Sequence, residues 1–242
     1  MLIAVTRPQD DAAELVTALE ARGHEVCLEP LLTIVPRRPV VWPEGHEKAQ
    51  ALLITSANGL RAFAALDPRR DLPVYAVGDA SAAAARAAGF PQVRSAAGTV
   101  EDLARMAGAE LSPAAGPLLQ PAASKLAGDL KGGLEAAGFE VLRAVIYDAE
   151  AAARFSADFC ARLNSELIDA VTLFSPRTAA TFVSLIGAAG LARACNSMTA
   201  LCLSEAVAER ISVLPWQAVL TAGRPDQESL LARLDAWAES GA

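Results

Sequence analysis

Short polar runs follow five apolar, strand-like segments of the sequence, and they hold the residues best suited to binding a small anionic ligand. Their hydroxyl, amide and guanidinium groups can donate hydrogen bonds to carboxylate oxygens. In an open parallel sheet, the loops at the carboxyl ends of the strands form the ligand crevice. The candidate binding residues are Thr6, Arg7, Ser56, Ala57, Asn58, Gly78, Asp79, Ser81, Ser175, Pro176, Arg177 and Ser204.

A purely structural role competes with binding at most of these positions, because the same residue types cap helix N-termini. Capping alone would explain Ser56, Asn58, Asp79, Ser175 and Ser204. Pro176 suits a first helical turn, where its missing N–H is not needed. The two roles are compatible, since a capped N-terminus still offers backbone N–H groups to an anion. Arg7 and Arg177 are the better candidates for direct contact with an anionic ligand; solvent exposure is the alternative.

The usual catalytic motifs are missing. His24 lies in a helix-to-strand turn and His46 in a polar loop, and neither belongs to a recognisable metal-ligand motif. The sequence contains no G-x-G-x-x-G after its first strand, no G-x-x-x-x-G-K-[ST] and no G-x-S-x-G. Nucleotide cofactors, phosphoryl transfer and serine-hydrolase chemistry are therefore disfavoured. We expect neither a metal nor a cofactor.

An internal repeat indicates how these loops are positioned. Residues 2–22 are predicted to form a strand, a turn and a helix, and the same plan returns at residues 118–137. Further matches pair residues 51–63 with 170–182, 74–88 with 199–211, and 93–96 with 219–222. Strands that alternate with amphipathic helices predict parallel α/β sheets, here with a flavodoxin-like strand order. Two similar α/β domains in one chain predict a ligand cleft between them.

Two long extended runs complicate the division into domains. Residues 25–35 and 140–150 are each about twice as long as a usual strand and occupy equivalent places in the repeat. A plain tandem would divide instead at the turn-rich residues 112–117. We expect each long run to leave one domain and enter the other, which makes a two-stranded linker that can act as a hinge. The predicted domains are residues 1–35 with 151–242, and residues 38–147.

Composition excludes several classes of protein. The 242-residue chain has a net charge of −7, a pI near 5.0 and only 5% aromatic residues, which argues against nucleic acid as a partner. It has no apolar run near the roughly 18 residues that a membrane span needs, and no basic leader at its N-terminus. We expect a cytoplasmic monomer without a membrane partner. The four cysteines form no C-x-x-C motif, and we expect them to be reduced.

The order and spacing of several short motifs resemble the uroporphyrinogen-III synthase family over nearly the whole chain. The matching segments are Val5-Thr-Arg-Pro8, Glu20-Ala-Arg-Gly-His-Glu-Val26, Pro30-Leu-Leu32, Thr55-Ser-Ala-Asn-Gly59, Ala76-Val-Gly-Asp-Ala-Ser81, Val145-Ile-Tyr147 and Phe174-Ser-Pro-Arg-Thr-Ala179. The resemblance implies two α/β domains joined by a two-stranded linker. It also implies a cofactor-free lyase that cyclises the anionic linear tetrapyrrole hydroxymethylbilane to uroporphyrinogen III, with inversion of ring D and loss of water.

The resemblance also implies roles for single residues. Tyr147 matches the tyrosine of the family's V-x-Y segment, and its protonated phenol could donate to the departing hydroxyl; packing on apolar neighbours is the alternative. Ser81 takes a threonine position of the family. Residues 120–126 lack the family's glycine-and-arginine pattern, so Lys125 could replace the arginine in binding carboxylates. The rival hypotheses are a non-catalytic two-domain binding or regulatory protein and an enzyme acting on a phosphorylated small molecule.

Overall fold

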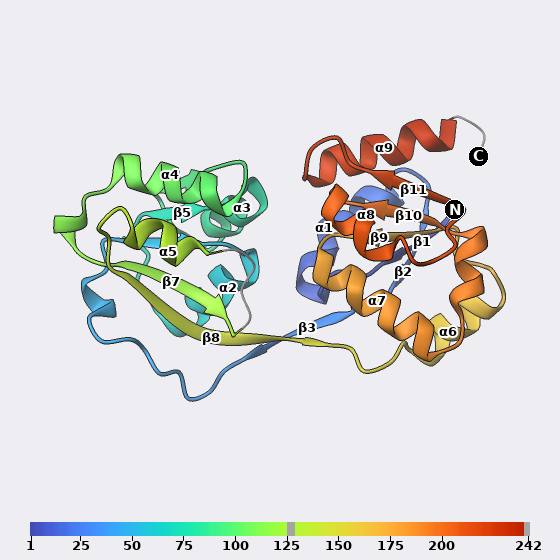
Figure 1. Ribbon diagram of the computed structural model, residues 1–242, viewed down its shortest axis with the longest axis horizontal. Helices are drawn as coiled ribbons and strands as arrows, with labels where there is room; N and C mark the ends of the chain where they lie inside the picture. The colour runs from blue at the N-terminus through green and yellow to red at the C-terminus, as the bar shows by residue number, and fades with distance from the viewer. Residues whose placement is uncertain (125–128, 240–242) are drawn as a thin grey trace. The chain divides into compact units, whose positions relative to one another are not determined.

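The computed structural model describes residues 1–124 and 129–239. The chain forms two compact units: unit 1 is Met1–Thr33 with Glu150–Ala242, and unit 2 is Ile34–Ala149. Each unit is a sheet with helices on both faces (Figure 1). Within the described residues, no helix is both long and apolar enough to cross a membrane.

The sheet of unit 1 is entirely parallel and has the strand order β11-β10-β9-β1-β2. Counted by position along the chain, this is the order 2-1-3-4-5 of flavodoxin, so the predicted strand order is confirmed. Its strands are β1 (Leu2–Val5), β2 (Glu25–Leu28), β9 (Ala170–Leu173), β10 (Thr199–Cys202) and β11 (Ala218–Thr221). Its helices are α1 (Gln9–Glu20), α6 (Ala157–Asn164), α7 (Pro176–Ala188), α8 (Glu205–Ile211) and α9 (Gln227–Glu239), with a 3₁₀ turn at Ala192–Ser197.

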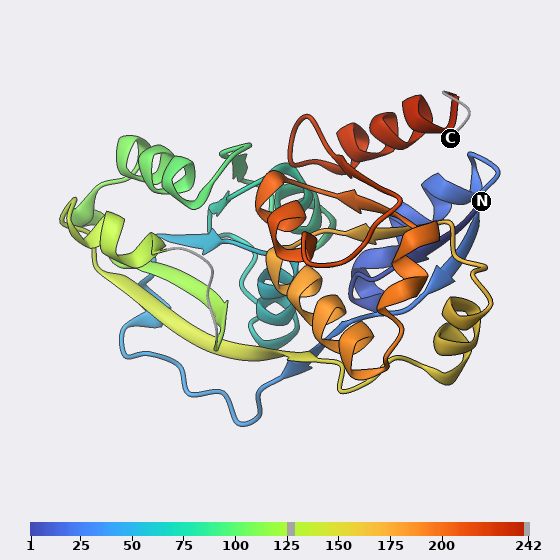
Figure 2. The same ribbon diagram turned by 45° about the vertical axis from the view of Figure 1, so that its right-hand side comes forward.

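Two hydrophobic clusters hold the helices of unit 1 on opposite faces of this sheet. Leucines of α1 and α9 pack with Ile3 and Val5 of β1 on one face. Phe159 of α6, Phe182 of α7 and neighbouring apolar residues of α8 pack with Ala4 on the other. Both views show α9 and α7 on opposite sides of the sheet (Figures 1 and 2). The alternation of Ile3, Ala4 and Val5 between the clusters follows from the two-residue period of a strand.

Unit 2 repeats this plan with its strands in a permuted chain order. Its sheet has the order β3-β8-β7-β4-β5-β6. When β7 is counted first, β8-β7-β4-β5-β6 is again 2-1-3-4-5, as the internal repeat predicts. The strands are β3 (Leu32–Pro36), β4 (Ala51–Ile54), β5 (Val74–Ala76), β6 (Val93–Ser95), β7 (Leu118–Ala123) and β8 (Val141–Ala151).

The helices of unit 2 also lie on two faces. Those helices are α2 (Ala57–Leu66), α3 (Asp79–Ala87), α4 (Val100–Glu110) and α5 (Leu130–Glu135), with 3₁₀ turns at His46–Lys48 and Pro113–Ala115. Phe63 of α2 and Ala82 of α3 belong to one buried cluster, whereas Leu103 of α4 and Leu134 of α5 belong to the other.

The prediction of one continuous strand over residues 25–35 is wrong. The run divides into β2 and β3, which belong to different sheets, whereas the second long run forms one strand, β8. Pro30 has no N–H to donate to a ladder. The side chain of Glu29 is only 7% exposed, and its carboxylate accepts hydrogen bonds from the backbone N–H and hydroxyl of Ser156, at 2.7 and 2.6 Å. A buried carboxylate needs such donors, and these bonds hold Glu29 in place between β2 and β3.

The segments that connect the two units are paired strands. The Arg37 N–H donates to the Ile146 carbonyl, and the Ala152 N–H donates to the Leu31 carbonyl. Residue numbers rise along β3 as they fall along β8, so the two strands are antiparallel. The Arg37 guanidinium also makes two hydrogen bonds to the Asp148 carboxylate, at 2.6 and 3.2 Å. The two connections therefore support each other as one ribbon.

Candidate ligand-binding site

The candidate ligand-binding edge of unit 1 lies where successive strand-to-helix connections pass to opposite faces of the sheet. Helix α1 follows β1 on one face, and α7 follows β9 on the other. Strands β1 and β9 are adjacent, with Ile3 opposite Ala170 and Val5 opposite Thr172. Open α/β sheets bind ligands outside the carboxyl ends of strands at such a point. Arg7 and Ser175 are each the second residue after these two strands.

The guanidinium of Arg7 is held by side chains from two other segments. Its Nη1 donates to the Gln227 side-chain oxygen at 3.2 Å, and its Cζ lies 4.4 Å from the centre of the Phe174 ring. Phe174 directly follows β9, and Gln227 is the first residue of α9. An arginine over an aromatic face gains cation–π stabilisation, so this cation has a defined place at the edge of the sheet.

Thr6 has a different role from the one expected. It is completely buried, and its hydroxyl donates to the Thr172 carbonyl of the neighbouring strand. The Thr172 hydroxyl in turn donates to the Ala4 carbonyl, at 3.2 Å. The Thr6 hydroxyl is therefore used inside the sheet, and we assign it to the β1–β9 pairing instead of to a ligand.

Ser175 and Ser56 both cap helices, as one of the two interpretations predicts. The Ser175 hydroxyl accepts a hydrogen bond from the Thr178 N–H at 3.1 Å, and the Ser56 hydroxyl accepts one from the Asn58 N–H at 3.2 Å. Pro176 is the first residue of α7, and Arg177 follows it. The caps leave other N–H groups of each first turn for an anion, so structural and binding roles remain compatible at both serines.

The corresponding edge of unit 2 lies between β7 and β4. Helix α2 follows β4 on one face, and the chain after β7 leads to α5 on the other. Ser56, Ala57 and Asn58 form the start of α2 here. The Asn58 side-chain oxygen accepts a hydrogen bond from Arg61 at 2.8 Å, so its orientation is fixed by its own helix.

Tyr147 lies in β8 and is mostly buried, with 6% of its surface exposed. It packs in the cluster that α2 and α3 form with the sheet. A Cβ at Gly59 would lie 3.0 Å from the Pro121 carbonyl oxygen and 3.6 Å from Cε1 of Tyr147. Glycine at position 59 thus lets the first turn of α2 approach both β7 and the tyrosine ring. Tyr147 packs as a core residue, and it also adjoins the candidate loop at Ser56.

The start of α3 differs in detail from the prediction. Gly78, not Asp79, is the N-cap residue, and Asp79 is an exposed first helical residue. Ser81 is buried, with 6% of its surface exposed, so little of its side chain faces solvent. Because β5 lies beside β4, α3 begins at the same edge of the sheet as α2.

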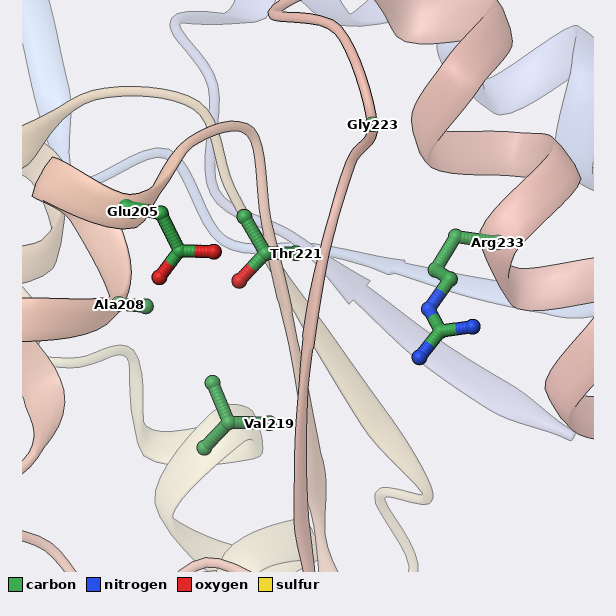
Figure 3. A pocket seen from close by; sticks show the side chains of 6 residues that line it. All are labelled: Glu205, Ala208, Val219, Thr221, Gly223 and Arg233. Carbon is green, nitrogen blue, oxygen red and sulfur yellow. The ribbon is translucent and has the colours of Figure 1, made fainter.

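A hollow of about 570 Å³ lies beside β11, the edge strand of the unit 1 sheet. It is lined by Glu205, Ala208, Val219, Thr221, Gly223 and Arg233 (Figure 3). No expected site residue is among them, although Ser204 precedes α8 there. Ser204 occupies the N-cap position of α8, but its side chain makes no capping hydrogen bond.

The two fully buried cysteines of unit 1 are poor nucleophiles. Burial raises the pKa of both the Cys195 and the Cys202 thiol to about 12, so these cysteines stay protonated at neutral pH. Across residues 1–124 and 129–239, no group of three or more histidine, cysteine, aspartate or glutamate side chains is placed to hold a metal ion. The arrangement is suited to binding and orienting an anion.

Sequence reasoning missed three residues at these edges. Phe174 and Gln227 hold Arg7, and Arg143 donates to the carbonyls of Ala123 and Ser124, at 2.7 and 2.8 Å, where β7 ends. An aromatic residue at the end of β9 was a usable signal for Phe174. The contact between Arg7 and Gln227 joins residues 220 positions apart in the chain, and nothing in the sequence indicates it. Lys125 lies outside the described residues.

A family model described as "Uroporphyrinogen-III synthase HemD" matches residues 13–232 of the chain. The chain belongs to this family. No curated protein sequence matches it. Family members are cyclising lyases of tetrapyrrole biosynthesis.

Solved structures of uroporphyrinogen III synthases have a similar fold. A mutant enzyme of Thermus thermophilus is 18% identical, with a TM-score of 0.55 over 99% of this chain and 98% of that one. The enzyme of Helicobacter pylori 26695 is 15% identical, with a TM-score of 0.59 over 97% and 98%. At these identities the likeness confirms the predicted two-domain α/β fold, while the family assignment rests on the family model.

Ser175 and Ser204, which occupy the N-cap positions of α7 and α8 in unit 1, provide a matched test of capping. Ser175→Ala should lower the free energy of unfolding by about 1 kcal/mol, because it removes the acceptor for the Thr178 N–H. Ser204→Ala should cost clearly less, because Ser204 makes no such bond. Urea unfolding of both variants measures the difference. Equal losses would show that the hydrogen bond from the Thr178 N–H adds nothing measurable to the stability of α7.

Proposed function

We propose that this chain cyclises hydroxymethylbilane to uroporphyrinogen III, with inversion of ring D and loss of water. The observation that carries the proposal is the family match over residues 13–232. The chemistry requires no group beyond the protein itself. Loss of the terminal hydroxyl leaves a resonance-stabilised cation, which attacks the substituted carbon of ring D and passes through a spiro intermediate.

Catalysis here is mainly a matter of conformation. The same precursor closes without an enzyme to isomer I, so the protein must hold a flexible chain in the conformer that reacts at the less accessible carbon. An enzyme that holds the reacting atoms in a near-attack geometry can lower the activation free energy substantially. A site of backbone donors and an anchored arginine meets this requirement.

The charge of the protein makes local donors necessary. The chain carries a net charge of −7, and the acetate and propionate arms of the substrate are also anionic. Binding then depends on positive groups and oriented dipoles at the site itself. In our proposal, Arg7, Arg177 and the first turns of α2 and α7 bind these carboxylates.

We further propose a cytoplasmic monomer that does not act on nucleic acid. The acidic net charge supports the last point, because binding to a phosphate backbone requires neutralisation by lysine and arginine.

The product isomer tests the proposed activity. Purified protein, incubated with hydroxymethylbilane in the presence of a chelator and without added cofactor, should shift the product from isomer I to isomer III. Oxidation of the products and chromatographic separation of the two porphyrins measure the ratio. A ratio equal to that of the enzyme-free control would contradict the activity and favour a non-catalytic binding protein.

We also propose that Tyr147 donates a proton to the departing hydroxyl. Tyr147→Phe should slow turnover by about 10- to 1000-fold, the usual worth of a positioned acid. Because the buried ring is retained, the melting temperature should stay within a few degrees. Steady-state formation of isomer III and thermal unfolding give the two readouts. Wild-type turnover in this variant would mean that Tyr147 serves only to pack β8 against α2.

A further inference from the structure

Arg7 differs from an ordinary surface cation because two anchored side chains hold it. Phe174 packs against the buried cluster of α1 and α9, so the position of its ring is set by the core. Gln227 begins α9, whose Leu230, Leu231 and Leu234 are buried in the same cluster. The guanidinium therefore contacts two residues whose own positions do not depend on a ligand.

The chemistry of these two contacts suits an arginine that binds an anion. The Arg7 Cζ lies over the face of the Phe174 ring, 4.4 Å from its centre, whereas carboxylates bind a guanidinium through its N–H groups. The aromatic ring offers no carboxylate or carbonyl acceptor, so this contact does not add a competing anion. Gln227 accepts a hydrogen bond without adding a negative charge, although the residues on either side of it, Asp226 and Glu228, are acidic.

We propose that Phe174 and Gln227 are positioning residues, which hold the Arg7 guanidinium for a carboxylate arm of the tetrapyrrole. This inference rests on the proposed function. A cation that is already oriented loses less side-chain entropy when the ligand binds. The carboxylates take no part in the bonds that break and form, so this contact stabilises the bound substrate and the transition state about equally.

Two substitutions test the arrangement through the Michaelis constant. Gln227→Glu keeps the shape and the acceptor but places a carboxylate beside Arg7, where it competes with the substrate; KM should rise about tenfold, the worth of one charge-assisted hydrogen bond. Phe174→Leu removes the aromatic face and should raise KM about 3- to 10-fold. In both variants kcat should change less than about twofold, because the lost contact stabilises the bound substrate and the transition state equally.

Matched controls separate positioning from general effects. Gln217→Glu adds the same charge to unit 1 at an exposed residue that does not contact Arg7, and it should leave KM unchanged. In an Arg7→Met background, neither Gln227→Glu nor Phe174→Leu should raise KM further, because each acts through the guanidinium. A rise in that background as large as in the wild-type background would overturn the proposal. So would an unchanged KM in both single variants.

Binding of uroporphyrin III, followed by its fluorescence, keeps this test independent of turnover. A wild-type protein that makes no isomer III contradicts the proposed function, but the affinity of the same variants for the porphyrin still decides the role of the two residues. Weaker binding in Gln227→Glu and Phe174→Leu, with unchanged binding in Gln217→Glu, supports the proposal. Equal affinity in all four proteins contradicts it.

Discussion

The pairing of the central parallel strands is the constraint on which the candidate site depends. In unit 1, β1 lies beside β9, and buried hydrogen bonds from Thr6 to Thr172 and from Thr172 to Ala4 cross between them. A slip of one residue would turn every side chain to the opposite face and would move Arg7 away from Phe174. Thr6 therefore holds the register of the two strands whose ends carry Arg7 and Phe174.

The same constraint operates in unit 2 with different residues. Strand β4 lies beside β7, with Ala51 opposite Leu118, and Gly59 allows the first turn of α2 to lie close to the Pro121 carbonyl. Tyr147 fills the adjoining space. Both units thus place a capped helix N-terminus beside the end of a central strand, from sequences that share little beyond the pattern of strands, turns and helices.

Properties carried by local pattern could be predicted from the sequence, whereas those carried by long-range contacts could not. The internal repeat predicts the strand order of both units. Ser56 and Ser175 are predictable as helix caps because each bonds to a backbone N–H two or three residues further along the chain. The placement of Glu29 between β2 and β3 depends on Ser156, and the placement of Arg7 depends on Gln227. Neither partner is visible in a single sequence. The burial of Tyr147 depends likewise on how closely α2 approaches the sheet.

The central claim is that the first turns of α2 and α7, at the carboxyl edges of their sheets, bind carboxylates of the tetrapyrrole. Its most direct test is the affinity for uroporphyrin III of Ser56→Trp and Ser175→Trp, made separately, since a large ring covers the backbone donors of a first turn that alanine would leave intact. We expect each substitution to weaken binding while the melting temperature stays within a few degrees of the wild type. If either variant binds as tightly as the wild type, that first turn does not bind the ligand and the claim is wrong.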